Sequence, residues 1–243
     1  MIPKIIHYCW FGRKPLSPLA LKCIASWKKH LPDYEIKEWN EDNFDVNQIP
    51  YIEQAYKCKK YAFVSDYARF KIMYEYGGVY FDTDVEVVKP LDDIIDKGTF
   101  FGLENNDENS NFACAPGLGF ACNPGLGLCK DMVELYKNLN FCVDGKNNIK
   151  TVVQYFSELL LEKGLKPHNG IIEFQNITIY PPDYFCPKSF ENGKIVMTEN
   201  TRTIHHYAAS WLGPKEKFIQ LLTRLIGTRN VLRLWKLLLK RGR

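Results

Sequence analysis

The sequence has 243 residues, of which 46% are hydrophobic and 25% are charged. These proportions suit a folded globular protein and exclude a chain that is disordered throughout. The formal net charge of +4 is unevenly distributed, because residues 214–243 alone carry nine Lys or Arg and one acidic residue. That segment has a net charge of +8, which leaves −4 for residues 1–213. A slightly acidic body argues against a protein that binds nucleic acid.

The eight cysteines form no CxxC pair, and none falls in a Cys/His cluster with the spacing of a structural zinc site. The first residues, MIPKIIHYCWFG, do not resemble a secretory signal, and no uncharged apolar stretch of about 18 residues indicates a membrane span. We therefore expect reduced cysteines that fill the core of a cytoplasmic protein.

Hydrophobic periodicity predicts alternating strands and helices in the first part of the chain. The predicted elements, in order, are a strand at 2–8, a helix at 16–30, a strand at 34–39, a helix at 59–76 and a strand at 79–81. Gly77 and Gly78 end the second helix. This order is typical of a parallel α/β sheet.

Further strands are predicted at 99–103 and 117–122, and helices at 125–139 and 149–163, before a loop-rich region with short strands. The segment GLGFACNPG resembles a dinucleotide loop only superficially, and we interpret it as a strand and turn of small residues beside the acceptor. We expect one mixed α/β domain over residues 1–213. Residues 214–243 are predicted to form a basic amphipathic helical tail, which either lies on an anionic membrane or docks on the body or a second subunit.

The segment VYFDTDVEVVKPL places two aspartates at the end of a predicted strand. Because side chains alternate along a strand, we expect Asp82 and Asp84 on one face, with Thr83 opposed. Two such carboxylates suit Mg²⁺ or Mn²⁺, and the carboxyl edge of a parallel sheet is where α/β proteins bind ligands. Two solvated aspartates in an exposed turn are the alternative.

Asp66 and Arg69 lie three residues apart on the preceding helix and therefore share a face. Their apolar and aromatic neighbours favour a pair that hydrogen-bonds sugar hydroxyls or phosphate oxygens, and a surface salt bridge is the alternative. Gly77 and Gly78 supply either the helix stop alone or room for a ligand close to the backbone.

Both ends of the predicted domain carry further candidates. His7 and Trp10 either fill the core or stack on a base. His205 and His206 lie on opposite faces of an extended segment, so at most one of them reaches a metal. Ser210-Trp211 either closes over a ligand or simply packs.

The blocks IPKIIHYCWFG, SDYARFKIMYEYGGVYFDTDVEVVKPL and IHHYAASW together resemble glycosyltransferase family 32, over roughly residues 2–213. That family includes bacterial capsular-polysaccharide sugar transferases and yeast-type α-1,6-mannosyltransferases, and it is distantly similar to the glucosyltransferase domains of large clostridial toxins. The resemblance implies a GT-A fold, a nucleotide-binding α/β sandwich with a mostly parallel central sheet. It also implies a nucleotide-sugar donor, a divalent cation (Mn²⁺ or Mg²⁺) and retention of anomeric configuration.

The resemblance assigns roles to residues of this chain. Asp84 would ligate the metal, Asp82 would reach the metal or the donor, and Trp10 would stack on the nucleobase. The terminal block completes the metal and diphosphate site, with His205 favoured over His206. The predicted catalytic residues are Asp66, Arg69 and Asp82; the predicted substrate-binding residues are His7, Trp10, Gly77, Gly78, Ser210 and Trp211; and the predicted metal ligands are Asp82, Asp84 and His205.

These observations predict a metal-dependent retaining glycosyltransferase that extends a surface or capsular polysaccharide. We expect a UDP-sugar donor, a saccharide or lipid-linked oligosaccharide acceptor, and a peripheral position on the inner face of the cell membrane if the tail binds lipid. A front-face route, in which the departing phosphate oxygen accepts the acceptor's proton, is the preferred chemistry. The alternatives are a GDP-mannose-dependent mannosyltransferase, a hydrolase of nucleotide sugars, an inactive nucleotide- or sugar-binding module, and a membrane-interaction protein.

Overall fold

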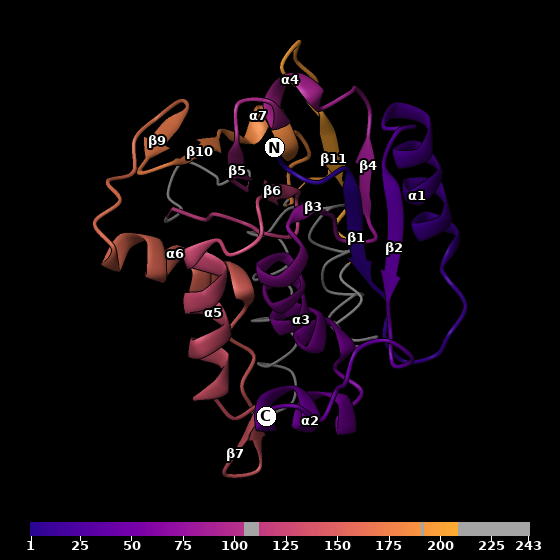
Figure 1. Ribbon diagram of the computed structural model, residues 1–243, viewed down its shortest axis with the longest axis vertical. Coiled ribbons are helices and arrows are strands. Elements are labelled where there is room, and N and C mark those ends of the chain that lie inside the picture. Colours follow the sequence, from indigo (N-terminus) through magenta and orange to yellow (C-terminus); the bar gives the residue numbers. More distant parts are fainter. Residues whose placement is uncertain (105–111, 191, 209–243) are drawn as a thin grey trace, which may run out of the picture.

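A mixed sheet forms the centre of the protein in the computed structural model, which describes residues 1–104, 112–190 and 192–208. Within these residues the sheet has seven strands in the order β2-β1-β3-β6-β5-β10-β9 (Figure 1). The strands are β1 (Ile5–Cys9), β2 (Glu35–Trp39), β3 (Gly78–Tyr80), β5 (Thr99–Gly102), β6 (Phe120–Cys122), β9 (Ile172–Phe174) and β10 (Ile177–Tyr180). Only β6 and β9 run against the other five. The predicted α/β class with a mostly parallel central sheet is confirmed.

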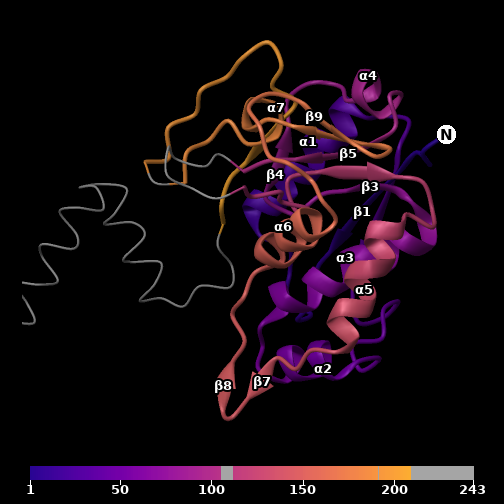
Figure 2. The ribbon, with the colours of Figure 1, turned by 90° about the vertical axis from the view of Figure 1, so that its left-hand side faces the viewer.

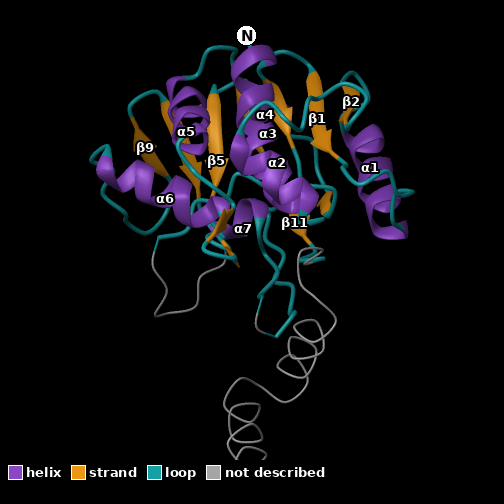
Figure 3. Ribbon diagram, turned by 90° about the horizontal axis from the view of Figure 1, so that it is seen from below, coloured by secondary structure: helices purple, strands orange, loops and turns teal. Residues whose placement is uncertain are grey.

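Helices cover both faces of this sheet. They are α1 (Pro18–His30), α2 (Pro50–Lys57), α3 (Tyr61–Tyr76), α4 (Asp92–Ile95), α5 (Gly127–Lys137), α6 (Val152–Glu162) and α7 (Pro182–Phe185). One apolar core joins α2, α3, α5 and α6 to one face, where α3 packs against both α5 and the sheet (Figure 3). A second core joins α1, α4 and α7 to the other face.

Two short strand pairs stand outside the central sheet. Strand β4 (Val85–Val87) pairs antiparallel with β11 (Thr203–His205), and this pair lies beside α1 (Figure 1). The hairpin of β7 (Cys142–Val143) and β8 (Lys146–Asn147) projects next to α2 (Figure 2). The β4–β11 pair matters for function because it brings the chain around residue 205 to the segment that follows β3.

Local sequence explains where α1 and α3 begin and end. The Ser17 hydroxyl accepts a hydrogen bond from the Ala20 amide, and Pro18 takes the first helical position, where its missing N–H costs nothing. Helix α3 ends at Gly77, whose φ of +61° is one that L side chains rarely adopt. The helices predicted at 16–30 and 59–76 are therefore confirmed, each within two residues.

Some predictions about the body need correction or lie outside the structure. All eight cysteines are free, and six are buried as expected, but Cys58 and Cys142 are exposed and do not fill the core. None of the described helices is long and apolar enough to cross a membrane. The predicted tail, residues 214–243, lies outside the described residues, so the division into a domain and a tail stays a prediction.

Candidate active site

The carboxyl ends of three strands that run in the same direction, β1, β3 and β5, lead into the candidate site. Trp10 follows β1, Asp82 follows β3 and Glu104 follows β5, so all three residues lie at one edge of the sheet. Strand β6 runs the other way between β3 and β5, and therefore the segment before it, with Gly117, reaches the same edge. This is the edge at which open α/β sheets bind their ligands.

Residues 82–84 form a turn between β3 and β4. The Val85 amide donates a hydrogen bond to the Asp82 carbonyl over 3.0 Å, which closes the turn. The expectation that Asp82 and Asp84 alternate with Thr83 along a strand was therefore wrong, because the strand ends at Tyr80. The two carboxylates instead take different partners.

Asp82 is held by cationic and phenolic groups from neighbouring elements. The Arg69 guanidinium lies 3.3 Å from Oδ1 through Nη2 and 3.4 Å from Oδ2 through Nη1. The Tyr80 hydroxyl donates to Oδ1 over 3.2 Å, and the Asp82 amide donates to the Gly117 carbonyl over 3.0 Å. The Asp82 side chain stays 29% exposed, so a ligand can reach it.

Asp66 and Arg69 form a buried ion pair on α3. Arg69 Nη2 lies 2.8 Å from Asp66 Oδ1, and their side chains are only 4% and 10% exposed, which rules out the surface salt bridge considered above. Burial raises the pKa of Asp66 to about 7, although Arg69 acts in the opposite direction. Burial acts to lower the pKa of Arg69, but Asp82, Tyr80 and Asp66 raise it, so the guanidinium stays charged. Arg69 thus bridges two carboxylates, and removing Arg69 would leave both of them without their cation.

Asp84 pairs with His205 across the β4–β11 ladder. His205 Nε2 lies 3.3 Å from Asp84 Oδ2, and the Ala208 amide donates to the same oxygen over 2.7 Å. Burial acts to raise the pKa of Asp84, but His205 and the Ala208 amide outweigh it and lower the pKa to about 2. Burial likewise opposes the charged form of His205, yet Asp84 raises its pKa well above the ordinary value. His206 has a different partner, because its Nε2 lies 2.7 Å from Glu86 Oε2.

The residues present fit a divalent cation in part. A carboxylate and an imidazole converge at Asp84 and His205, a donor set that suits Mn²⁺ better than Mg²⁺, which prefers oxygen ligands. The predicted third ligand, Asp82, is directed to Arg69 instead. In the part of the chain that the structure describes, no group of three or more His, Cys, Asp or Glu side chains is arranged around a metal position. A complete ligand set therefore needs oxygens from outside these residues.

His7 and the two glycines do not join this site. His7 is fully buried, and its Nδ1 accepts a hydrogen bond from Trp39 Nε1 over 3.0 Å, so it is a core residue and not a substrate contact in this structure. Gly77 and Gly78 have φ values of +61° and +96°, and a Cβ on either would lie under 3 Å from backbone atoms. They precede Asp82 by five and four residues, which corresponds to roughly 13–17 Å of extended chain. Backbone conformation and packing account for both, as in the helix-stop alternative.

Trp10 lies at the correct edge, but its contacts here are structural. It is partly buried against the core, and its indole Nε1 donates to the Lys14 carbonyl over 2.6 Å. Its predicted contact with a nucleobase stays a prediction. Ser210 and Trp211 lie outside the described residues.

Glu104 is a candidate that the sequence motifs did not indicate. Burial raises the pKa of its carboxyl, His205 acts to lower it and Asp82 acts to raise it further, so Glu104 lies within electrostatic reach of both residues. The signal was present in the sequence, because Glu104 follows β5 as Asp82 follows β3. No motif marks it, because it opens the polar segment ENNDENSN, which is typical of a loop.

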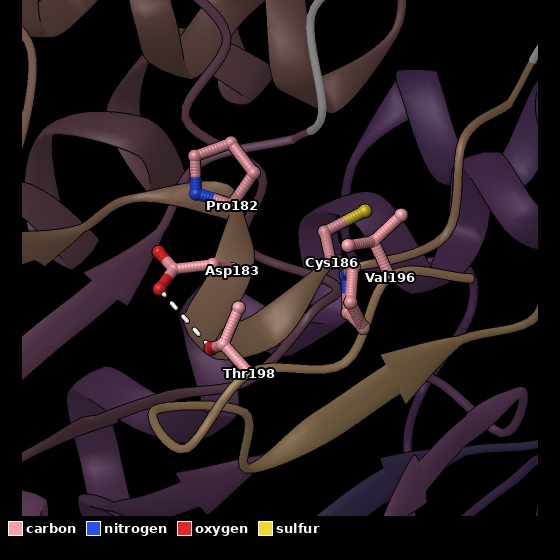
Figure 4. Close-up of a pocket in the computed structure, with 6 residues that line it drawn as sticks. Pro182, Asp183, Cys186, Val196 and Thr198 are labelled. Atoms are coloured by element: carbon pink, nitrogen blue, oxygen red, sulfur yellow. Dashed lines mark hydrogen bonds between the residues drawn. The ribbon is translucent and has the colours of Figure 1, made fainter. Parts of the chain in front are cut away.

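A separate pocket of about 210 Å³ opens on α7 and the loop after residue 195. Its lining residues are Pro182, Asp183, Cys186, Pro187, Val196 and Thr198 (Figure 4). None of the predicted site residues that the structure describes lines it. Its nearest link to the site is Cys186, whose Sγ lies 2.9 Å from the hydroxyl of Tyr207, and the Tyr207 ring packs 4.3 Å from the ring of His205.

Comparison with known proteins finds sequence similarity to glycosyltransferases. Residues 18–101 match the model of a family described as a glycosyltransferase sugar-binding region containing a DXD motif. An uncharacterized glycosyltransferase, L373, of Acanthamoeba polyphaga mimivirus is 33% identical over 110 residues, 42% of this chain and 43% of that protein. Inositol phosphoceramide mannosyltransferase 3 of Schizosaccharomyces pombe is 31% identical over 101 residues, 39% of this chain and 27% of that protein. The chain thus spans less than half the length of these curated relatives.

Two solved structures are similar to this one. The PaToxG glycosyltransferase has a TM-score of 0.47 at 21% identity, covering 67% of this chain and 70% of that one. A glycosyltransferase involved in glycosylation of the major capsid of PBCV-1 has a TM-score of 0.49 at 13% identity, covering 85% of this chain and 96% of that one.

Residues 18–101 of the chain thus resemble a glycosyltransferase sugar-binding region containing a DXD motif, in agreement with the predicted class of enzyme. The region contains Asp66, Arg69, Asp82 and Asp84. Assignment to glycosyltransferase family 32 stays a prediction.

Proposed function

We propose that the chain is a metal-dependent glycosyltransferase of the GT-A type that binds a nucleotide-sugar donor at the turn of Asp82 and Asp84. One observation carries the proposal: the DXD turn lies at the carboxyl edge of the sheet, with the buried Arg69 on one side and His205 on the other. Asp82 with Arg69 and Asp84 with His205 would therefore contact different parts of a donor.

The charges around the turn favour a divalent cation. The carboxylates of Asp66, Asp82, Asp84 and Glu104 gather near two cationic side chains, Arg69 and His205. Asp84 and His205 would hold the cation, and His205 must lose its proton to do so, because only the neutral imidazole is a ligand. When bound, a cation there supplies Lewis-acid stabilisation of the diphosphate as the glycosidic bond breaks. The remaining ligands would come from the donor's diphosphate oxygens.

Arg69 has a different part in the proposal. It is the cation closest to Asp82, and the ion pair with Asp66 fixes its guanidinium in one orientation. From this position Arg69 and Asp82 would hydrogen-bond the donor's sugar and phosphate oxygens, and Trp10 would face the base. Retention by a front-face route, in which the departing phosphate oxygen accepts the acceptor's proton, requires no carboxylate nucleophile. Covalent trapping of a glycosyl-enzyme at Asp82 or Glu104 would contradict this route.

The donor proposed first is a UDP-sugar, with a saccharide or lipid-linked oligosaccharide acceptor used in surface polysaccharide synthesis at the inner face of the cell membrane. A mannosyl donor such as GDP-mannose is the second candidate, and one observation favours it: the similar protein of Schizosaccharomyces pombe is named as a mannosyltransferase. The two candidates share the same turn and differ in the base and the sugar.

Calorimetric titration of UDP and GDP into the full chain, with and without Mn²⁺, tests the proposal. We expect one nucleotide to bind only with Mn²⁺, and binding to be lost in Asp84→Ala. Asp33→Ala is the matched control, because it removes a carboxylate whose side chain is 78% exposed and lies far from the turn in the first βα unit. Failure of both nucleotides to bind under every condition would contradict the proposal.

A further inference from the structure

Gly117 lies directly against the pair formed by Asp82 and Arg69. A Cβ at position 117 would overlap with Asp82 Oδ2, and it would lie 2.8 Å from Asp82 Cγ and 3.0 Å from Arg69 Nη1. Non-bonded heavy atoms are essentially never found within 3.0 Å of a real Cβ, so a side chain at 117 would force a neighbour to move. The space that a side chain would fill at this position is thus taken by the Asp82 carboxylate.

The backbone of Gly117 does not itself require glycine. Its φ lies outside the left-handed region, unlike that of Gly119 two residues later, which is +127°. The segment turns because the Leu118 amide donates to the Ala115 carbonyl over 3.2 Å, a bond that alanine at 117 would leave intact. The requirement for glycine is therefore one of space, and the group that needs the space is Asp82.

Gly117 also holds the main chain of the DXD turn. Its carbonyl accepts a hydrogen bond from the Asp82 amide over 3.0 Å, which fixes the main chain of Asp82. The missing side chain of the same residue leaves space for the Asp82 carboxylate. The Asp82 side chain is 29% exposed and could turn aside only by leaving Arg69, which has little freedom to follow it. The Arg69 side chain is only 4% exposed, and its guanidinium lies 5.0 Å above the ring of the buried Tyr80.

We propose that Gly117 is a positioning residue of the DXD turn. Its missing side chain admits the Asp82 carboxylate to Arg69, which keeps Asp82 apart from the Asp84–His205 pair and divides the turn into its two halves. The role of this separation in donor binding rests on the proposed function. The spacing itself is a property of the fold and can be measured without any ligand.

A double-mutant cycle on thermal stability tests the spacing. We expect Gly117→Ala to lower the apparent Tm by about 5–10 °C, the range of moderate overpacking in a chain of this size. In an Asp82→Ala background the overlapping atoms are gone, so adding Gly117→Ala should leave the Tm unchanged or raise it by about 1–3 °C. An equal loss in both backgrounds would overturn the inference.

Gly127 provides the matched control. It also lacks a left-handed φ, and no heavy atom lies within 4 Å of its virtual Cβ, so Gly127→Ala should be neutral or slightly stabilising in both backgrounds. If Asp82→Ala does not fold, Asp82→Ser replaces it, because serine lacks Oδ2; its Oγ still fills the γ position, so Gly117→Ala should then lower the Tm by less than it does in the wild type. An equal loss would again overturn the inference.

Nucleotide titration of the same variants separates the two proposals. With wild-type nucleotide binding present, Gly117→Ala should weaken it about tenfold or more while Gly127→Ala does not. If the wild-type chain binds no nucleotide, the proposed function fails, and the Tm cycle still decides the role of Gly117. If nucleotide binds but Gly117→Ala shows no coupling to Asp82, the inference about Gly117 fails alone.

Discussion

Burial of His7 should make the stability of this protein depend on pH. His7 is fully buried, and burial lowers its pKa from 6.5 to about 4. Between these two values the unfolded chain binds a proton that the folded chain does not, so stability falls as pH drops through this window. The difference between the two pKa values corresponds to a loss of about 3 kcal/mol at the acid end.

His7→Asn isolates this contribution. The asparagine amide oxygen can accept the hydrogen bond that Trp39 Nε1 now donates to Nδ1, but it does not titrate. The smaller side chain lowers stability at every pH, so the informative quantity is the slope. Asp66 contributes a change of opposite sign over the same window, so the comparison is between the two slopes: in urea unfolding between pH 4.5 and 7.5, the change of the unfolding free energy with rising pH should be less positive in His7→Asn than in the wild type. His168→Asn, at an exposed position, is the control. The same slope in His7→Asn and the wild type would refute the reasoning.

Three further predictions concern Asp66, Trp27 and Glu104. Burial raises the pKa of Asp66 to about 7, so its contribution to stability is present below about pH 4 and lost as pH rises through 7; Asp66→Asn should remove that fall in urea unfolding, and an unchanged profile would contradict it. Trp27 is fully buried, and its Nε1 donates to the Val85 carbonyl over 2.7 Å. Trp27→Phe leaves that carbonyl without this donor and opens a gap, so it should lower the free energy of unfolding by about 2–4 kcal/mol. An unchanged urea midpoint would contradict this prediction. Glu104→Gln removes a negative charge near His205 and Asp82 and should weaken Mn²⁺ binding in calorimetry about three- to tenfold, whereas unchanged affinity would place Glu104 outside the site.

Elements with strong periodicity or clear end signals could be predicted from the sequence. The helix around Trp27 has a serine cap, a proline at its first position and a buried stripe, and the helix of Asp66 ends at a glycine with positive φ. Such signals are local, so they act whatever the rest of the chain does. For the same reason the pairing of Asp66 with Arg69 could be predicted, because residues three apart on a helix lie on the same face.

The arrangement of the DXD turn could not be predicted in the same way. Strand alternation put Asp82 and Asp84 together, but β3 ends at Tyr80, and their partners come from distant segments. Asp82 turns to Arg69, and Asp84 to a histidine 121 residues later. Only the pairing of β4 with β11 brings that histidine close.

Burial of polar residues was the other obstacle. His7 carries the same sequence signal as a ligand-binding histidine, and its role as a core acceptor for Trp39 depends on β1 pairing with β2. Glu104 shows the opposite error. No DXD-like pair marks it in the sequence, and it reaches the same edge of the sheet as Asp82 because β3 and β5 run in the same direction.

The most direct test of the central claim is turnover of the donor at the DXD turn. The measurement is release of nucleoside diphosphate from UDP-sugars and GDP-mannose by the full chain, with and without Mn²⁺, compared with Asp84→Asn. Asparagine keeps an acceptor for the Ala208 amide but removes the charge that would hold the cation. The account predicts release that requires Mn²⁺ and falls about 100-fold in Asp84→Asn, the scale expected when one electrostatic stabiliser is removed. Release that needs no metal and persists in Asp84→Asn, or no release from any donor, would contradict it.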